Sequence, residues 1–427
     1  MSAEIDFYAK YPPSKPAVPN ILGSKAKSLH SKDNIRDLQS FITSKKIRQG
    51  LQRVAAGLLW ERTGNPKQKY RVVHCGRSIA GDGVAVYRAA DGTRARLSGL
   101  TTCGSGWMCP VCAQNIAEAR RKEASKAMVQ HIQGGGQAHL VTLTFSHHAD
   151  EPLPEMLKKF DDARQSFKNC VTWKTILGKK DGKEGEAGCI GAITALEVTY
   201  GIANGWHPHV HMVVLTKKEV TAFQQERLKC EWVRILLKKG LSDRSQVTDL
   251  MERAFDMRGG ADAADYITKY GREEHWGLTS ELVRAHSKQG LMDGRYKPFG
   301  LLQLAGEGNA WAAERFKEFA VAFHGKRLLT WSPGLKKAFD LQEIDDAELS
   351  DDALPVEERV GRLTPEQWKV VLDRDARADL LMYAAGYCAA GEQQSLDEYI
   401  EHLSKRPKTS RGWFIQKPDG CEPWVYH

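Results

Sequence analysis

The chain has no run of apolar residues approaching the roughly 20 that a membrane-spanning helix needs, and its mean hydropathy is −0.47. The first segment, MSAEIDFYAKYPPSKPAVPN, lacks the apolar core and the cleavage site of a secretory signal. The cysteines number nine, an odd count, so a disulfide scaffold is not expected in this context. We therefore expect a cytoplasmic protein with no membrane partner, whose thiols are reduced or bind a metal.

What the chain does have is positive charge. Its 427 residues include 62 Lys and Arg against 53 Asp and Glu, a net charge of +9. Residues 340–358 hold nine carboxylates and no Lys or Arg, so the rest of the chain carries about +18. A basic body that leaves out one acidic stretch suits an anionic partner such as nucleic acid. A basic surface is also often only a soluble one.

The sequence pattern predicts an α+β fold with an antiparallel sheet. The expected helices cover 111–133, 155–177, 217–240 and 259–271, and the last has Asp262 as N-cap and Gly271 as stop. The expected strands cover 138–145, 189–200 and 206–216. The loop GIANG between the last two strands has an ordinary length for a hairpin connection.

The length suits two or three domains of ordinary size. The composition divides the chain into a mobile basic N-terminal arm at 1–68 and a cysteine module with its helix at 69–134. A central α+β domain is expected at 135–340, followed by an acidic, helical C-terminal region at 341–427. A glycine-rich, charged loop is expected at 178–188.

Four cysteines have the spacing of metal ligands. Cys109 and Cys112 form a Cys-x2-Cys pair in TTCGSGWMCPVC, Cys103 precedes them, and Cys75 lies 28 residues before Cys103. Two thiolates in so short a turn match the bite of a tetrahedral zinc ion, and the other two can complete four ligands. Cys75 is the most distant of them, and His74 could replace it. The alternatives are buried thiols without a metal, or a redox pair, which would need a βαβ context that the sequence does not show.

Three histidines alternate in WHPHVHMVV, and alternate residues of a strand share one face. If the hairpin closes at GIANG, Glu197 falls opposite His209, with Cβ atoms about 5 Å apart. A carboxylate and two imidazoles can hold a divalent ion and leave positions open for a substrate oxygen. His209, His211 and Glu197 are therefore the candidate ligands, and His207, nearer the hairpin end, would lie behind them. The alternative is a solvent-facing histidine strand with one charged neighbour.

Tyr266 and Tyr270 are four residues apart, so on a helix they share a face, with Lys269 at its flank. A phenol has a pKa of about 10 and is a poor nucleophile at neutral pH. A nearby ammonium and a metal-bound phosphate would both favour the phenolate. Alone, this spacing is more often the half-buried stripe of an ordinary helix, so the pair indicates function only beside the histidine strand.

Together, VTLTF at 141–145, HPHVH at 207–211 and YITKY at 266–270 resemble the three ordered motifs of rolling-circle replication initiators. These initiators belong to the superfamily of nucleases with a His-hydrophobic-His metal site, the HUH endonucleases. LTWSPGL at 329–335 is similar to a distal segment of plasmid-type members, and the cysteine knuckle is similar to that of several members. The resemblance covers residues 70–335. It implies an RRM-like palm, an antiparallel sheet with helices on one face, within 135–340.

The resemblance also implies an enzyme that nicks and rejoins a DNA strand. His209 and His211 match the metal-binding pair, and Tyr270 matches the nucleophile of Tyr-x-x-Lys-Tyr, with Lys269 beside it. The implied ions are Mg²⁺ or Mn²⁺ at the catalytic site and Zn²⁺ at the cysteines. The implied partners are single-stranded or hairpin origin DNA, with a host helicase and polymerase.

Tyr266 stands where many plasmid initiators carry a glutamate. In this respect the chain resembles two-tyrosine phage initiators and some single-strand transposases. The departure leaves open whether termination uses hydrolysis or a second tyrosyl transfer.

Two other functions fit the same residues. A single-strand transposase would use the same chemistry, and only genetic context separates it from an initiator. A zinc-containing DNA-binding regulator would have no activity. A metal-dependent nick that leaves protein on the 5′ end would exclude the regulator.

Overall fold

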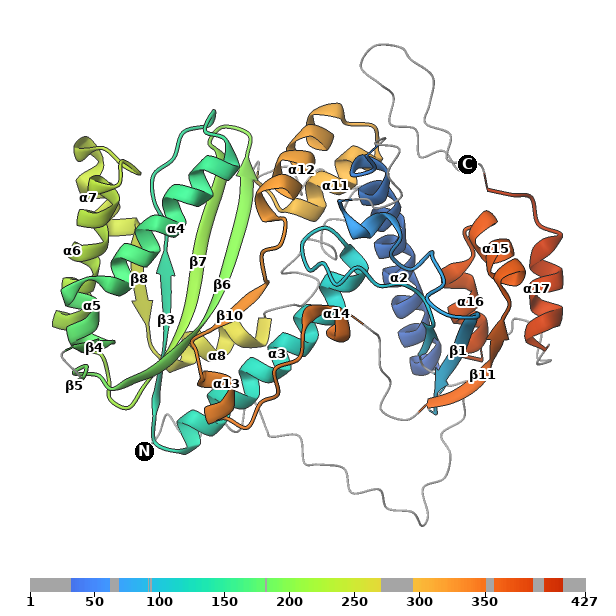
Figure 1. The fold of residues 1–427 in the computed structure, drawn as a ribbon, viewed down its shortest axis with the longest axis horizontal. Helices are drawn as coiled ribbons and strands as arrows, with labels where there is room; N and C mark the ends of the chain where they lie inside the picture. Colours follow the sequence, from blue (N-terminus) through green and yellow to red (C-terminus); the bar gives the residue numbers. More distant parts are fainter. Residues whose placement is uncertain are drawn as a thin grey trace.

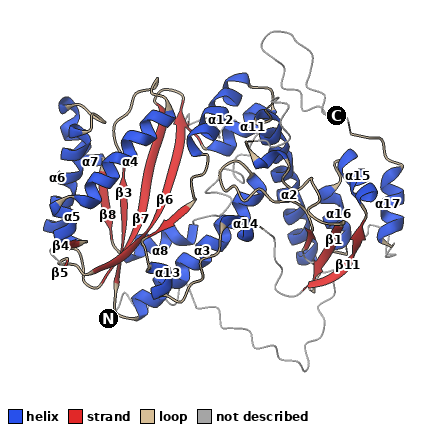
Figure 2. Cartoon of the chain, in the orientation of Figure 1, coloured by secondary structure: helices blue, strands red, loops and turns tan. Residues whose placement is uncertain are grey.

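The computed structural model of the chain describes residues 32–61, 69–90, 92, 94–180, 183–269, 295–350, 357–386 and 395–409. Over these residues the protein has an α+β fold with antiparallel sheets, as predicted (Figures 1 and 2). The largest sheet has the strand order β10-β6-β7-β3-β8, and β9 pairs with β6. Within the described ranges, no helix is long and apolar enough to cross a membrane.

The main sheet consists of β3 (Gln137–Leu143), β6 (Cys189–Gly201), β7 (Gly205–Thr216), β8 (Phe255–Arg258), β9 (Arg295–Tyr296) and β10 (Leu329–Trp331). The helices around it are α3 (Pro110–Gln133), α4 (Leu153–Asn169), α5 (Val171–Ile176), α6 (Ala222–Lys238), α7 (Val247–Arg253), α8 (Gly260–Lys269), α11 (Pro298–Gly306), α12 (Ala310–Phe323) and α13 (Leu335–Ala338).

Strands β6 and β7 form a long hairpin at the centre of the main sheet. Its loop closes with Gly201 paired to Gly205, and Gly205 has a φ of +72°. A Cβ at Gly205 would lie 2.6 Å from a backbone carbonyl oxygen, so glycine is required there. The predicted register is confirmed, because Glu197 pairs with His209. The alternating histidines of β7 therefore share one face of the sheet.

The opposite face of the sheet carries much of the core. Phe255, Leu143 and Val210 form a buried row across β8, β3 and β7. Helix α4 covers this row, since Phe167 packs edge-on against Phe255 with ring centroids 6.3 Å apart. Trp232 of α6 in turn packs on Phe167, at 5.3 Å between centroids. Apolar burial on this side fixes which face of the hairpin is left for the histidines.

Helix α8 lies on the histidine face of the same sheet, so helices cover both of its faces and not the single face that was expected. Its Tyr266 donates a hydrogen bond to Glu197 of β6, and the helix packs on β3 and on α3. Helix α3 begins at the cysteine turn, where the Cys109 sulfur accepts a hydrogen bond from the Cys112 amide and Pro110 occupies the first turn. The cysteine segment thus starts the helix that supports α8.

Two helix predictions need correction. The helix expected over 155–177 is broken at Cys170 into α4 and α5, because the Cys170 sulfur caps the second helix by accepting a hydrogen bond from the Trp173 amide. Asp262 is not the N-cap of α8, because that helix already begins at Gly260 and Asp262 lies in its first turn. The predicted stop at Gly271 lies outside the described residues.

Two segments expected to be irregular have regular structure. The loop 178–188 contains a short hairpin, β4 (Lys179–Lys180) and β5 (Lys183–Glu184). The N-terminal arm includes α2 (Lys32–Leu58). The second half of α2 is ordered by tertiary burial, with Val54 and Ala55 almost inaccessible, which the basic composition did not indicate.

A second sheet joins the segment between Cys75 and Cys103 to the C-terminal region. It lies at the far end of the molecule from β8 (Figures 1 and 2). Strand β1 (Val84–Ala89) pairs with β2 (Ala95–Ser98) on one side and with β11 (Glu357–Leu363) on the other. Helices α15 (Pro365–Asp373), α16 (Arg377–Ala384) and α17 (Leu396–Ser404) complete this part.

The second sheet has its own hydrophobic cluster, which includes Val84, Val86, Leu363, Trp368 and Leu381. Some of these residues precede the strands of the main sheet in the sequence, such as Val84, and others follow them, such as Leu363. The acidic, helical C-terminal region is therefore paired by a strand to a segment far upstream. The domain boundaries expected at 68, 134 and 340 stay predictions.

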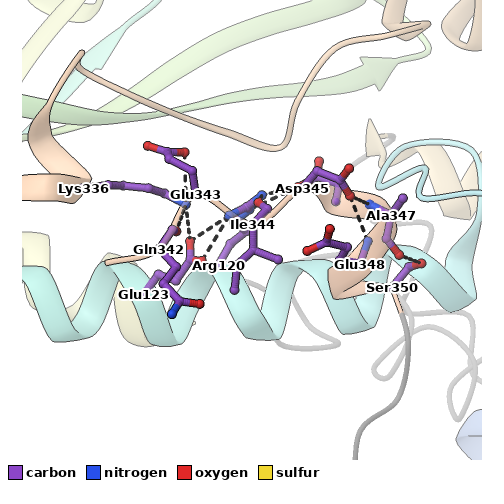
Figure 3. A network of polar contacts seen from close by, with 11 residues as sticks. Arg120, Glu123, Lys336, Gln342, Glu343, Ile344, Asp345, Ala347, Glu348 and Ser350 are labelled. Atoms are coloured by element: carbon purple, nitrogen blue, oxygen red, sulfur yellow. Dashed lines mark hydrogen bonds and ion pairs between the residues drawn. The ribbon is translucent and has the colours of Figure 1, made fainter. Parts of the chain in front are cut away.

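The part of the acidic stretch from 342 to 350 lies along α3 (Figure 3). Arg120 of α3 has 8% side-chain exposure, and its Nη2 lies 2.7 Å from Asp346 Oδ1 and donates to the Ile344 carbonyl at 2.8 Å. Glu123 contacts Arg120 at 2.9 Å and the buried Lys336 at 3.1 Å. The short helix α14 (Asp346–Leu349) follows. Part of the acidic charge is therefore neutralised inside the fold rather than displayed.

Candidate functional site

The predicted metal ligands come together. His209 Nε2 lies 3.4 Å from Glu197 Oε2, and His211 Nε2 lies 4.0 Å from the same oxygen. One ligand atom from each of the three residues falls within 4.8 Å of the others. Ligands of an octahedral ion such as Mg²⁺ lie about 3.0 Å apart when adjacent and about 4.2 Å apart when opposite. The three half-buried side chains could therefore hold one divalent ion without large rearrangement.

The two imidazoles are oriented by their other ring nitrogens. His211 Nδ1 lies 3.0 Å from the Thr142 hydroxyl of β3, and His209 Nδ1 lies 3.4 Å from the His207 carbonyl oxygen. When Nδ1–H donates to these oxygens, Nε2 is left as the lone-pair nitrogen of each ring. Both Nε2 atoms face Glu197, so in this tautomer both rings would present a lone pair to a metal ion held there.

Tyr266 reaches the same cluster from α8. Its hydroxyl donates to Glu197 Oε1 at 2.7 Å, while Glu197 Oε2 faces the histidines. The ring also packs on His211, with centroids 4.9 Å apart. A phenol oxygen is thus placed one hydrogen bond from the candidate metal ligands, which a helix stripe packed only in the core would not show.

The other two residues predicted for this site are Lys269 and Tyr270. Lys269 is exposed, and its Nζ forms an ion pair with Asp265 one helical turn earlier, at 2.6 Å. Tyr270 lies outside the described residues. The roles assigned to these two side chains stay predictions.

His207 contacts a second imidazole rather than the candidate ligands' carboxylate. Its Nδ1 lies 2.8 Å from His147 Nε2, so one ring donates and the other accepts. Burial, reinforced by His209 and His147, lowers the pKa of His207 to about 3. Burial also lowers the pKa of His147. Both rings are therefore neutral near neutral pH, and one N–H is shared between the two facing nitrogens.

The four predicted cysteines also converge. The Cys75 sulfur lies 3.7 Å from that of Cys109 and 3.4 Å from that of Cys112, and the Cys103 sulfur lies 3.6 Å from that of Cys112. Sulfurs around one tetrahedral zinc ion lie about 3.8 Å apart for a Zn–S distance of about 2.3 Å. All four side chains are buried. The geometry fits a four-thiolate site with Cys75, not His74, as the fourth ligand.

Polar side chains from distant helices surround the cysteines. Gln52 of α2 donates to the Cys75 carbonyl at 3.0 Å and to the Cys109 sulfur at 3.4 Å. Arg377 of α16 donates to Gln52 Oε1 and to the Gly76 carbonyl, both at 3.0 Å. Burial lowers the pKa of Arg377 to about 10, which still leaves it charged at neutral pH. A buried cation beside four thiols suits a site that carries negative charge.

The sequence offered unequal signals for the residues that it missed. Thr142 lies inside the quoted motif VTLTF, and His147 lies two residues after it, so both could have been found by examining this motif and the residues that follow it. Gln52 and Arg377 have no local signal, because they reach the cysteines only through the packing of α2 and α16.

Comparisons with known proteins agree with these motifs. A family model described as "Replication protein" matches residues 94–379. The chain is 31% identical over 384 residues to "Protein rep" of Streptomyces lividans, which covers 75% of this chain and 83% of the relative. It is 35% identical over 150 residues to "Neomycin resistance protein" of Streptomyces cyanogenus, which covers 31% of this chain and 34% of the relative. No solved structure gives a significant match.

Proposed function

Because the chain belongs to the replication protein family, we propose that it starts rolling-circle replication by nicking one DNA strand at an origin. The observation that supports this most strongly is the meeting of a phenol, two imidazoles and a carboxylate from three separate elements, β6, β7 and α8. Side chains of this kind can hold a divalent ion and place a nucleophile beside it. A protein that only binds DNA has no need of this arrangement.

In the proposed reaction a tyrosine oxygen attacks the scissile phosphorus and the bond to the 3′ oxygen breaks. The products are a 5′-phosphotyrosine link and a free 3′-hydroxyl that can prime synthesis. Bound Mg²⁺ or Mn²⁺ would offset the negative charge that develops on the phosphate. The covalent link conserves the phosphodiester energy, so rejoining needs no ATP.

The two tyrosines have separate parts in this proposal. Tyr270, which matches the nucleophile of the family motif, would attack first. Tyr266, held against Glu197 Oε1, would attack in the second round and release a circle. Glu197 can take the Tyr266 proton through that hydrogen bond, while His209 and His211 hold the ion. Lys269 would favour a phenolate by its charge once it leaves Asp265.

The cysteine site is proposed to hold zinc in a structural role. Its four sulfurs close the coordination sphere and leave no position for substrate. Partners proposed with this function are single-stranded or hairpin origin DNA, and a host helicase and polymerase that would use the nicked end.

A nicking assay tests the proposal. Labelled single-stranded oligonucleotides that tile the DNA beside the gene are incubated with the protein and Mn²⁺, and covalent adducts are resolved on denaturing gels. We expect a nick with protein on the 5′ end, lost in EDTA. Tyr270→Phe should abolish the adduct and keep DNA binding, and His209→Ala should abolish metal-dependent cleavage. The exposed His402→Ala on α17 is the control and should cleave normally.

Three results would contradict parts of this proposal. An adduct that persists in Tyr270→Phe and disappears in Tyr266→Phe would make Tyr266 the first nucleophile. Unchanged cleavage by His209→Ala in excess Mn²⁺ would refute its role as a ligand. No nick on any oligonucleotide, with binding intact, would favour a non-catalytic regulator.

A further inference from the structure

A pocket of about 330 Å³ opens beside the candidate metal ligands Glu197, His209 and His211 (the metal cluster). Its walls come from the loop after β3, the ends of β6 and β7, helix α7 and strand β9. The lining residues that matter here are Thr144, His147, Thr199, His207, Arg253 and Arg295. None of these six is among the candidate metal ligands or the tyrosines, so the pocket is a separate feature of the same face.

His207 joins this pocket to the metal cluster. It lies on the same face of β7 as His209, and the two rings stack with centroids 5.4 Å apart. On its other side His207 contacts His147 at 2.8 Å. A group bound in the pocket would therefore lie directly beside whatever occupies the metal cluster, on the side toward the hairpin end.

The lining separates into a polar interior and a cationic rim. The interior has the paired imidazoles and the hydroxyls of Thr144 and Thr199. Arg253 is 75% exposed and pairs at 3.0 Å with Asp249, which also lines the pocket, and Arg295 is exposed. Donors, acceptors and imidazole rings inside suit a nucleobase, and exposed guanidinium groups suit the phosphate attached to it.

We propose that this pocket takes one unpaired nucleotide of the DNA strand, adjacent to the scissile phosphate, and that His147 contacts its base and sets a sequence preference there. The inference rests on the proposed nicking function, because that function places a strand across the neighbouring metal cluster. A bare phosphate would contact only the arginine rim and none of the interior side chains, whereas a nucleotide can reach both. The occupant is therefore a nucleotide within a strand.

Selection from a random pool tests this pocket. Single-stranded oligonucleotides with a randomised central window are incubated with the protein and Mn²⁺, and the covalently captured fragments are sequenced. We expect His147→Ala to reduce the base preference about tenfold at one position next to the nick, and to leave the preferences at the other positions unchanged. His148→Ala changes the exposed neighbour, which does not line the pocket, and should give the wild-type pattern. His147→Gln has a side chain of similar size and serves as the second variant if His147→Ala does not fold.

A second arm separates failure of the pocket from failure of the nuclease. The same pool is selected by binding alone in EDTA, where no nick is needed. If the wild-type protein forms no adduct but His147→Ala loses one binding preference, the pocket stands and the nicking proposal fails. Identical preferences for all variants in both arms would overturn the pocket. Competition for the pocket by micromolar free mononucleotide would also overturn it, because the occupant would then be a soluble nucleotide.

Discussion

His139 of β3 is a buried titratable group outside the metal cluster, with a side chain 1% exposed. The Thr216 hydroxyl donates to the Lys218 carbonyl at 2.8 Å, so it accepts from His139 Nε2–H at 3.1 Å. Burial lowers the pKa of His139, while Glu219 opposes the shift from 3.9 Å. A lowered pKa means that folding excludes a proton that the unfolded chain binds at about pH 6.5 and below.

From this sign we expect the free energy of unfolding to fall as pH drops below about 6.5, and to be highest above it. Urea melts at pH 7 and pH 5 measure the effect. His139→Gln removes the titrating ring and keeps a donor for Thr216, so its loss of stability between the two pH values should be smaller than that of the wild type. The exposed His402→Gln should match the wild type. An equal loss in His139→Gln would refute the assignment.

At the scale of single residues, the sequence predicted that the three candidate metal ligands lie together, because one hairpin contains all of them. Counting across the GIANG loop placed Glu197 opposite His209, and the pairing is confirmed. The residues that orient the cluster could not be found this way. Thr142 reaches His211 from the neighbouring strand β3, and the order of strands in a sheet is not encoded in any local spacing.

At the scale of elements, the contact between α3 and the acidic stretch should stabilise the fold. Replacing Arg120 by Met leaves Asp346 without its buried partner and leaves Glu123 with Lys336 alone (Figure 3). Removing one member of a buried ion pair costs about 3 kcal/mol, and chemical denaturation should show this loss. Lys122→Met on the same helix removes only an exposed contact to Glu118 at 3.6 Å, worth less than about 1 kcal/mol.

Equal effects of the two variants would show that the acidic stretch does not hold α3. If Arg120→Met is less stable and also nicks DNA more slowly, this contact has a role in activity as well as in stability. Helix α3 packs on α8, which carries Tyr266, so a displaced α3 would move the phenol from Glu197.

Element boundaries were predictable where apolar periodicity or turn residues determine them. Helix α3 ends at Gln133 before three glycines, as expected. The break at Cys170 was not predictable, because the residues on both sides favour a helix and a thiol as a cap is an uncommon signal. Helix α8 begins at Gly260, ahead of the expected N-cap Asp262, because Gly260 follows β8 closely, a constraint that comes from the sheet rather than from helix propensity.

At the scale of the whole molecule, the cysteine site should hold helices α2, α3 and α16 together. It contacts α2 through Gln52 and α16 through Arg377, and it begins α3. Structural zinc contributes free energy to folding. We therefore expect one zinc per chain by metal analysis, and none in Cys103→Ser.

Hydrogen exchange would show where the stabilisation acts. After chelation, exchange should rise in α2 and α16, while the β6–β7 hairpin stays protected because its contacts do not depend on the cysteines. Cys230→Ser, which changes an exposed cysteine, should keep both the zinc and the protection. Full protection of α16 in the zinc-free protein would contradict this role.

The large-scale arrangement was the least predictable part. The composition marked the C-terminal region as acidic and helical, and α15 to α17 agree with the helical part. Nothing in that segment indicates that β11 pairs with β1, because the partner strand lies beyond the whole main sheet in the sequence. Long-range pairing depends on cores such as the one around Val84 and Leu363, which form only in the assembled chain.

This late pairing has a consequence for biosynthesis. Strand β1 leaves the ribosome early, yet its partner β11 is translated only after the entire main sheet. Until then one edge of β1 is open, and Val84 and Val86 lack the cover that Leu363 and Trp368 provide. A polypeptide stalled before residue 357 would present that edge to other nascent chains, so translation of the last segment closes the site at which co-translational aggregation would begin.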